Sequence, residues 1–250
     1  MRRFFIDKIE PEDGLLSITG AEANHIIRVV RMDVGDRIIL MNTGGARFQA
    51  IIKSIKPREV EVFLEKSLPT PPPSPVEIIL CQALLKARAM DYLIQKTSEL
   101  GVNHIFPFSS SRTVISLDGN RIENKLRHWR EIAKSAVKQS DRGIPVKISQ
   151  GLTFRDMTAR WKQEDVLKII LWEEEGAQDL KEVLKASSSY LKKFIGIVGP
   201  EGGFNGAEIA AAGEAGFIPV SLGKRVLRAE TAAITMVAIV QYERGDLGLP

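Results

Sequence analysis

A run of prolines divides the chain more sharply than any other feature. Five prolines fall within the seven residues 69–75, in the sequence Pro69-Thr70-Pro71-Pro72-Pro73-Ser74-Pro75. Proline has no backbone N–H and a fixed φ, so this stretch can continue neither a helix nor a central strand and behaves as an extended spacer. We therefore predict two domains, 1–68 and 76–250, joined by a linker at 69–75.

Short β-prone runs dominate the segment before the linker. Five of them are separated by polar turns, at 4–6, 15–18, 37–41, 47–55 and 59–64. Residues 21–30 differ, because His25, Arg28 and Arg31 recur there at helical spacing. The pattern predicts a small β-barrel with one short helix that presents a histidine and two arginines on one face.

Strand-like and helical patterns alternate after the linker. The apolar runs lie at 76–81, 103–108, 145–149, 166–171, 194–198 and 218–222. The helical patterns lie at 87–100, 121–140, 205–216 and in a last segment that ends at Arg244. Because such alternation is typical of a parallel sheet covered by helices, the predicted fold class of this part is α/β.

Two glycine-bearing segments follow the last two strand-like runs. They are residues 199–204, GPEGGF, and residues 222–232, LGKRVLRAETA. Loops at the carboxyl ends of parallel strands build ligand sites, and glycine lets backbone amides and carbonyls approach a ligand closely. Neither segment has the spacing of a P-loop or of a dinucleotide-binding loop. We expect a small molecule held by main-chain hydrogen bonds, although the local sequence also allows a purely structural turn.

Composition excludes several other classes of protein. The hydrophobic share of 44% and the charged share of 26% are typical of globular domains, and the net charge of +4 favours a polyanionic partner without requiring one. The single cysteine, Cys81, lies in a strand-like run, so we expect a buried inert thiol and a reducing cytoplasm. The three histidines have no cysteines at metal-binding spacing, and residues 232–240 are too short to span a membrane. We expect no metal and no membrane insertion.

The predicted helix at 121–140 separates its residues by face. Leu126, Trp129 and Ala133 recur at core spacing. The basic residues recur along another face, at Arg127, Arg130, Lys134 and Lys138. This basic stripe is a candidate track for RNA phosphates, and a solvated helix face is the alternative.

Taken together, these motifs resemble the RsmE family of methyltransferases. Its members methylate N3 of uridine in ribosomal RNA of the small subunit and belong to the SPOUT, or trefoil-knotted, class. Besides GPEGGF and LGKRVLRAETA, the resemblance rests on MRRFF at 1–5, His25 with Arg28 and Arg31, KTSELGV at 96–102 and QSDR at 139–142. The motifs occur in the family's order along nearly the whole chain.

The resemblance implies a fold and a set of partners. The fold is a PUA-like β-barrel followed by a knotted α/β domain, in which the threaded part is roughly 198–230. The cofactor is S-adenosylmethionine, the substrate is 16S ribosomal RNA, within the small ribosomal subunit, and the enzyme is a homodimer. Two alternatives stay open: a SPOUT enzyme that methylates another base or a ribose in transfer or large-subunit RNA, and a non-catalytic RNA-binding assembly factor.

The resemblance also implies roles for particular residues. The implied cofactor-binding residues are Leu171, Val198, Gly199, Pro200, Glu201, Gly202, Gly203, Leu222, Gly223, Val226, Leu227 and Thr231. For catalysis, Arg228 is expected to stabilise negative charge on the uracil, and Glu201 or Glu230 to orient a group or accept the proton. The implied RNA-binding residues are Arg2, Arg3, His25, Arg28, Arg31, Arg112, Arg130, Lys134 and Arg142. The sequence departs from the family at Asp141 and Lys224, where glycine and proline are common.

Overall fold

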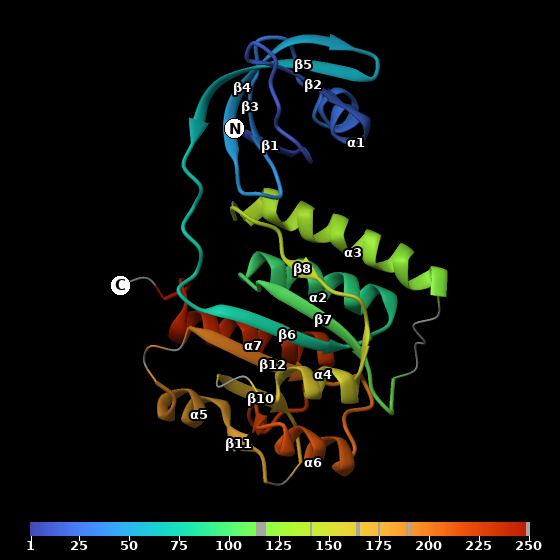
Figure 1. The fold of residues 1–250 in the computed structure, drawn as a ribbon, viewed down its shortest axis with the longest axis vertical. Helices are drawn as coiled ribbons and strands as arrows, with labels where there is room; N and C mark the ends of the chain where they lie inside the picture. Colours follow the sequence, from blue (N-terminus) through green and yellow to red (C-terminus); the bar gives the residue numbers. More distant parts are fainter. Residues whose placement is uncertain are drawn as a thin grey trace. The chain divides into compact units, whose positions relative to one another are not determined.

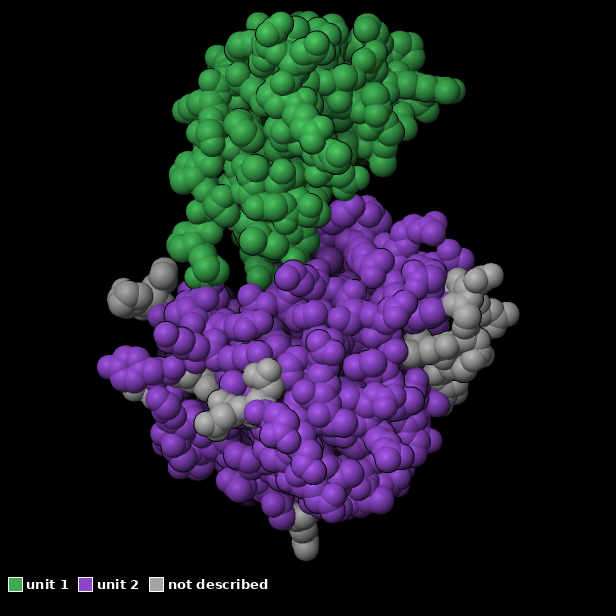
Figure 2. Space-filling view, viewed as in Figure 1, with its two compact units in different colours: residues 1–73, 137–145 green, residues 74–136, 146–250 purple. Residues whose placement is uncertain are grey.

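The protein divides into two compact units. The computed structural model describes residues 1–113, 119–140, 142–163, 166–174, 176–188, 190 and 192–248, apart from the side chains of 119–121. Unit 1 comprises Met1–Pro73 and Val137–Pro145, and unit 2 comprises Ser74–Ala136 and Val146–Pro250, coloured separately in Figure 2. The first boundary lies among the prolines. Residues 137–145 group with unit 1, which the sequence did not indicate.

Unit 1 is built on one five-stranded sheet. Its strands are β1 (Arg2–Phe5), β2 (Leu15–Thr19), β3 (Arg37–Met41), β4 (Arg47–Lys56) and β5 (Glu59–Leu68). They lie in the order β1-β3-β4-β5-β2; β1 and β3 are parallel, and the other neighbours are antiparallel. The hydrogen-bond ladder is left open between β1 and β2. The predicted small β domain is therefore present.

The predicted short helix of unit 1 is also present. It consists of α1 (Gly20–Asn24) and a π-helical segment, η1 (His25–Val30). Ala23 and Ile26 pack into the core of the sheet, where neither side chain is exposed. The segment ends at Arg31, whose φ of 56° is left-handed. A residue other than glycine in this conformation is uncommon.

Unit 2 alternates strands and helices along the sequence, as Figure 1 shows. Its strands are β6 (Glu77–Ala83), β7 (His104–Ser109), β8 (Lys147–Ile148), β9 (Leu152–Thr153), β10 (Leu167–Leu171), β11 (Gln178–Asp179), β12 (Lys193–Val198) and β13 (Ile218–Ser221). Its helices are α2 (Ala87–Glu99), α3 (Gly119–Ser140), α4 (Phe154–Trp161), α5 (Leu180–Ala186), α6 (Gly206–Glu214) and α7 (Ala229–Arg244). The last turn of α3 belongs to unit 1.

The strands of unit 2 form one parallel sheet. Their order is β11-β13-β10-β12-β6-β7-β8, with β9 beside β7, and each of these described pairs is parallel. The predicted α/β class is confirmed. Because parallel strands end at the same edge, the loops that follow β10, β12 and β13 all start there.

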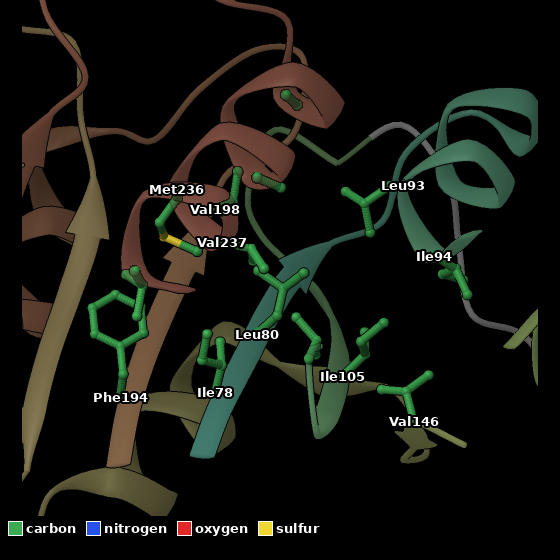
Figure 3. Packing of buried hydrophobic residues seen from close by; sticks show 14 of the residues in the cluster. Ile78, Leu80, Leu93, Ile94, Ile105, Val146, Phe194, Val198, Met236 and Val237 are labelled. Carbon is green, nitrogen blue, oxygen red and sulfur yellow. The ribbon is translucent and has the colours of Figure 1, made fainter. Parts of the chain in front are cut away.

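Both faces of this sheet are buried. Ile78 and Leu80 of β6 belong to one apolar cluster, shown in Figure 3, and the alternate residues Ile79 and Cys81 belong to the other. Residues of α2, α3, α5 and α7 complete the first cluster, and residues of α4 and α6 complete the second. A strand buried on both faces reads as a continuous apolar run, which explains the sequence pattern.

Two helices were not predicted. They are α4 and α5, of 8 and 7 residues. Each is preceded by a side chain that accepts a hydrogen bond from the first turn: Thr153 from the N–H of Asp156, and Asp179 from the N–H of Lys181. Such N-caps satisfy backbone donors that a helix start leaves unpaired.

The expected burial of the single cysteine is confirmed. Cys81 is fully buried in β6, and burial raises the pKa of its thiol to about 12. The thiol is therefore protonated at neutral pH and unreactive in the folded state. In the described part of the chain, no helix is both long and apolar enough to cross a membrane.

Candidate active site

A large cavity opens at the carboxyl edge of the sheet in unit 2. Its volume is about 1030 Å³. Three segments at the ends of neighbouring strands contribute to it: residues 171–174 from the end of β10, residues 198–204 from the end of β12, and residues 220–230, except Lys224, from the end of β13. The first turn of α2 lies beside them. Ligand pockets in open α/β sheets lie at this edge, so this cavity is the candidate site.

The first glycine loop, 199–204, turns tightly along the cavity. The N–H of Gly203 donates to the carbonyl of Pro200 at 3.0 Å, and Gly203 has a φ of 67° that favours glycine. A Cβ on Gly199 would lie 3.0 Å from the ring of Phe204. The buried Phe204 ring therefore occupies the space that a side chain at Gly199 would need.

The second glycine loop, 222–228, leads into helix α7. Gly223 has a φ of 102°, and a Cβ there would meet no heavy atom within 4 Å. Arg228 is the N-cap residue of α7, and its carbonyl accepts from the N–H of Ala232 at 2.8 Å. Arg228 and Glu230 thus line the cavity from the start of a long helix, which fixes their backbone.

Neighbouring loops hold the first glycine loop through polar contacts. The Arg112 guanidinium donates to the carbonyl of Gly202 at 2.9 Å. The carboxylate of Glu201 accepts from the backbone N–H of Lys86 at 3.3 Å. These contacts join the segments after β6 and β7 to the loop after β12. They show that Arg112 and Glu201, two predicted site residues, have structural contacts.

The chain beyond the first glycine loop is also anchored. Asn205 and Glu208 form a reciprocal capping box at the start of α6. The Glu208 carboxylate accepts in addition from the N–H of Ser111 at 2.8 Å, and the Asn205 amide donates to the Ser111 hydroxyl at 2.9 Å. The segment that follows β7 therefore fixes the C-terminal end of the first glycine loop and the start of α6.

The structure gathers most of the predicted cofactor and catalytic residues. All the predicted cofactor residues except Thr231 line the cavity, as do Arg228, Glu201 and Glu230. Thr231 is exposed, one position further along α7. Lys224 is exposed and is not among the lining residues.

Other lining residues were not predicted. Trp172, Glu173 and Glu174 follow β10 directly, and Tyr92 lies on α2. A Cβ added at Gly203 would lie 4.0 Å from a carboxylate oxygen of Glu173. This carboxylate therefore faces the first glycine loop. Their position after a buried strand was the signal that could have found the three residues after β10.

The predicted RNA-binding residues of unit 1 lie in different surroundings. Arg2, Arg28 and Arg31 are exposed. Arg3 is half-buried and donates to the carbonyl of Lys138 at 3.3 Å. The His25 ring is half-buried, with its centroid 5.6 Å from that of Phe4 in an edge contact.

The basic stripe on α3 is less uniform than the sequence suggested. Arg127 and Arg130 are exposed, and Arg130 donates to the carbonyl of Ile148 at 3.4 Å. Lys134 lies 3.1 Å from Glu131. Lys138 forms an ion pair with Glu22, and both side chains are largely covered. Lys138 therefore forms an ion pair within unit 1 and is not an exposed part of the basic stripe.

Arg142 and Asp141 belong to the last of the sequence motifs, QSDR. Arg142 is half-buried in unit 1. Asp141 and the side chain of Arg121 lie outside the described residues. Among the residues that are described, no group of three or more histidine, cysteine or acidic side chains is arranged to hold a metal ion.

Family models match both parts of the chain. A model described as an RNA methyltransferase domain matches residues 72–241, and one described as an RNA methyltransferase PUA domain matches residues 18–65. The chain is 30% identical to ribosomal RNA small subunit methyltransferase E of Bacillus subtilis, over 98% of this chain and 100% of that protein. It is 31% identical to the protein of the same name from Mesomycoplasma hyopneumoniae, over 95% and 97% of the two chains.

Solved structures share the fold. A methyltransferase of Legionella pneumophila, solved with its bound cofactor SAM, has a TM-score of 0.90 and 31% identity, over 98% of both chains. Ribosomal RNA small subunit methyltransferase E of Neisseria gonorrhoeae, bound to S-adenosyl methionine, has a TM-score of 0.88 and 28% identity, over 99% of both chains. The predicted fold class, an α/β methyltransferase domain behind a PUA-like domain, is confirmed.

The packing of Phe204 on Gly199 generates a stability prediction. In Gly199→Ala the new methyl group crowds the Phe204 ring, so we expect a loss of about 1–3 kcal/mol in the free energy of unfolding of unit 2. Urea unfolding followed by tryptophan fluorescence measures this, because Trp129, Trp161 and Trp172 all lie in unit 2.

Gly206→Ala is the matched control for this substitution. A Cβ on Gly206, the first residue of α6, meets nothing within 4 Å, so this variant should be as stable as the wild type or slightly more stable. Equal stability of the two variants would contradict the crowding at Gly199.

Proposed function

This chain belongs to the RsmE family of RNA methyltransferases, and on that premise we propose that it transfers a methyl group from S-adenosylmethionine to N3 of a uridine in 16S ribosomal RNA. The observation that carries the proposal is the cavity at the carboxyl edge of the sheet, where the two glycine loops meet. S-adenosylmethionine supplies a methyl group bound to a positively charged sulfur.

The residues around the cavity fit this cofactor. The volume of about 1030 Å³ suits a ligand of its size. Gly203 and Gly223 leave open backbone along the wall, since a Cβ at either position would meet no side chain closer than 4.0 Å. Carboxylates and cationic side chains both line the cavity, which suits a molecule that carries charges of both signs. We propose that the predicted residues lining the cavity, from Leu171 to Leu227, bind it.

Arg228 is the proposed catalytic residue for the uracil. Uracil N3 carries a proton and becomes an effective nucleophile only when that proton is lost, so the site must stabilise the anion. The Arg228 side chain is exposed at the start of α7, and no described side chain pairs with it. Its guanidinium can therefore donate to O2 or O4, where the negative charge gathers.

Glu230 is the better candidate for accepting the N3 proton. The carboxylate of Glu201 already accepts a hydrogen bond from the backbone of Lys86, which assigns it a positioning role in the first glycine loop. Glu230 is half-buried beside Arg228 in the first turn of α7, and it has no described hydrogen-bond partner. A carboxylate without a partner keeps its lone pairs available for a proton.

We also propose a division of labour between the domains. Residues 1–68 bind RNA, with Arg2, Arg28 and Arg31 as exposed contacts, residues 69–75 form the linker, and 76–250 bind cofactor and carry out catalysis. The proposed knot threads roughly residues 198–230, and the proposed assembly is a cytoplasmic homodimer. Two aromatic side chains are exposed on α2 and α7, Tyr92 and Tyr242, and they support an interface between the two copies of the homodimer.

One experiment tests the activity directly. The purified protein is incubated with labelled S-adenosylmethionine and small ribosomal subunits from cells that lack the gene, and the modified nucleoside is identified by mass spectrometry. We expect N3-methyluridine. Another methylated nucleoside would overturn the specificity, and cofactor binding without any transfer would favour a non-catalytic assembly factor.

The role of Arg228 gives a kinetic prediction. Arg228→Ala should abolish turnover and leave the Kd for S-adenosylmethionine within several-fold of the wild type, because the arginine is proposed to contact the uracil. Arg155→Ala, which removes an exposed arginine of α4 far along the chain from the loops, is the control and should retain turnover. Full activity of Arg228→Ala would remove the residue from the mechanism.

The basic face of α3 gives a binding prediction. Replacing Arg130 and Lys134 together with alanine should weaken RNA binding and flatten its dependence on salt, because phosphate contacts release counterions. The control replaces Lys181 and Lys185 on α5, which removes the same charge from another helix. If both double variants keep the wild-type salt slope, the stripe is only a solvated face.

A further inference from the structure

A buried amide at the end of β6 lies outside the lining of the cavity. Gln82 is fully buried, and its strand neighbours are Val198 of β12 and Pro107 of β7, both without polar side chains. Its side chain does not line the cavity. A buried polar group in such surroundings destabilises the fold unless it is hydrogen-bonded.

The Gln82 amide donates to two backbone carbonyls. Its Nε2 lies 3.0 Å from the carbonyl oxygen of Ala83 and 3.3 Å from that of Gly199. The reverse orientation of the amide would bring its oxygen against two other acceptors, so these neighbours fix which end points at them. The buried Oε1 has no hydrogen-bond partner among the residues that the structure describes. The side chain therefore acts here as a donor of two hydrogen bonds.

The carbonyl of Gly199 is an unusual point of attachment. The next residue is Pro200, which has no N–H, so the peptide unit between them carries a single hydrogen-bonding group. Gly199 has no side chain that could fix this unit instead. The orientation of the first peptide plane of the glycine loop thus depends on what holds that carbonyl, and Gln82 holds it.

We propose that Gln82 is a positioning residue for cofactor binding: its amide fixes the Gly199 carbonyl from outside the cavity lining and so orients the backbone of residues 199–203. This inference rests on the proposed function, because the loop must bind S-adenosylmethionine for its orientation to matter. Gln82 touches neither the cofactor cavity nor the reacting atoms. Its effect is on affinity for the cofactor.

Gln82→Met tests the proposal, because methionine matches the length of glutamine and donates no hydrogen bond. Calorimetry with S-adenosylmethionine should show a Kd raised about tenfold, which is about 1.4 kcal/mol. In turnover assays the KM for S-adenosylmethionine should rise, while kcat at saturating cofactor should stay within about twofold.

Gln241→Met is the matched control. Gln241 of α7 is also fully buried and accepts from the Ser74 hydroxyl at 2.9 Å, away from the glycine loops. Its substitution should lower the free energy of unfolding and leave the Kd unchanged. An unchanged Kd in Gln82→Met overturns the proposal, and so does an equal loss of affinity in both variants, since that would reflect general destabilisation.

Gln82→Glu keeps the test decisive if Gln82→Met fails to fold. A buried carboxyl beside two carbonyls favours its protonated form, which donates one hydrogen bond, and loses that donor as pH rises. The Kd of the variant should therefore increase with pH more than the Kd of the wild type does. The pH dependence of the wild-type Kd serves as the baseline, because it contains any contribution from Lys86, Arg112 and Glu201 around the loop. A Kd equal to that of the wild type at a pH at which NMR titration shows the introduced carboxyl to be ionised refutes the role. Absence of binding by the wild type would instead refute the proposed function.

Discussion

The parallel direction of β10, β12 and β13 is the constraint on which the site depends. Parallel neighbours end at one edge, so segments that begin at Trp172, Gly199 and Leu222 meet around one cavity despite their separation in the sequence. The same arrangement requires burial on both faces, which the two apolar clusters provide. The parallel direction of the strands therefore determines both the burial of the two faces and the position of the site.

The first glycine loop, which presents backbone to the cavity, needs other groups to hold it in place. Gly203 leaves open backbone along the cavity, whereas Phe204 and Arg112 fill the space beside Gly199 and Gly202, and glycine also has the greatest freedom to move. The loop is held by its own Phe204 ring, which packs on Gly199, and by polar contacts from β6 and from the segments after β6 and β7. Rigidity and open backbone are thus supplied by different residues.

The sequence predicted what depends on repeated or local patterns. Apolar runs located the long strands, and glycines after β12 and β13 located the cavity, because both signals are local. The short helices α4 and α5 contain too few turns to establish a period, although their N-caps Thr153 and Asp179 were readable. The ion pair between Lys138 and Glu22, 116 positions apart, and the role of Gln82 depend on tertiary contacts that no spacing reveals.

The buried position of Cys81 makes its thiol a reporter of local opening of the fold. The thiol lies in β6, between β12 and β7, and next to Gln82, and its raised pKa makes it inert while the sheet is closed. Its side chain belongs to the apolar cluster formed with residues of α4 and α6, so a thiol reagent can modify it only when this layer opens. The rate of modification at high reagent concentration therefore measures how often the layer of α4 and α6 opens.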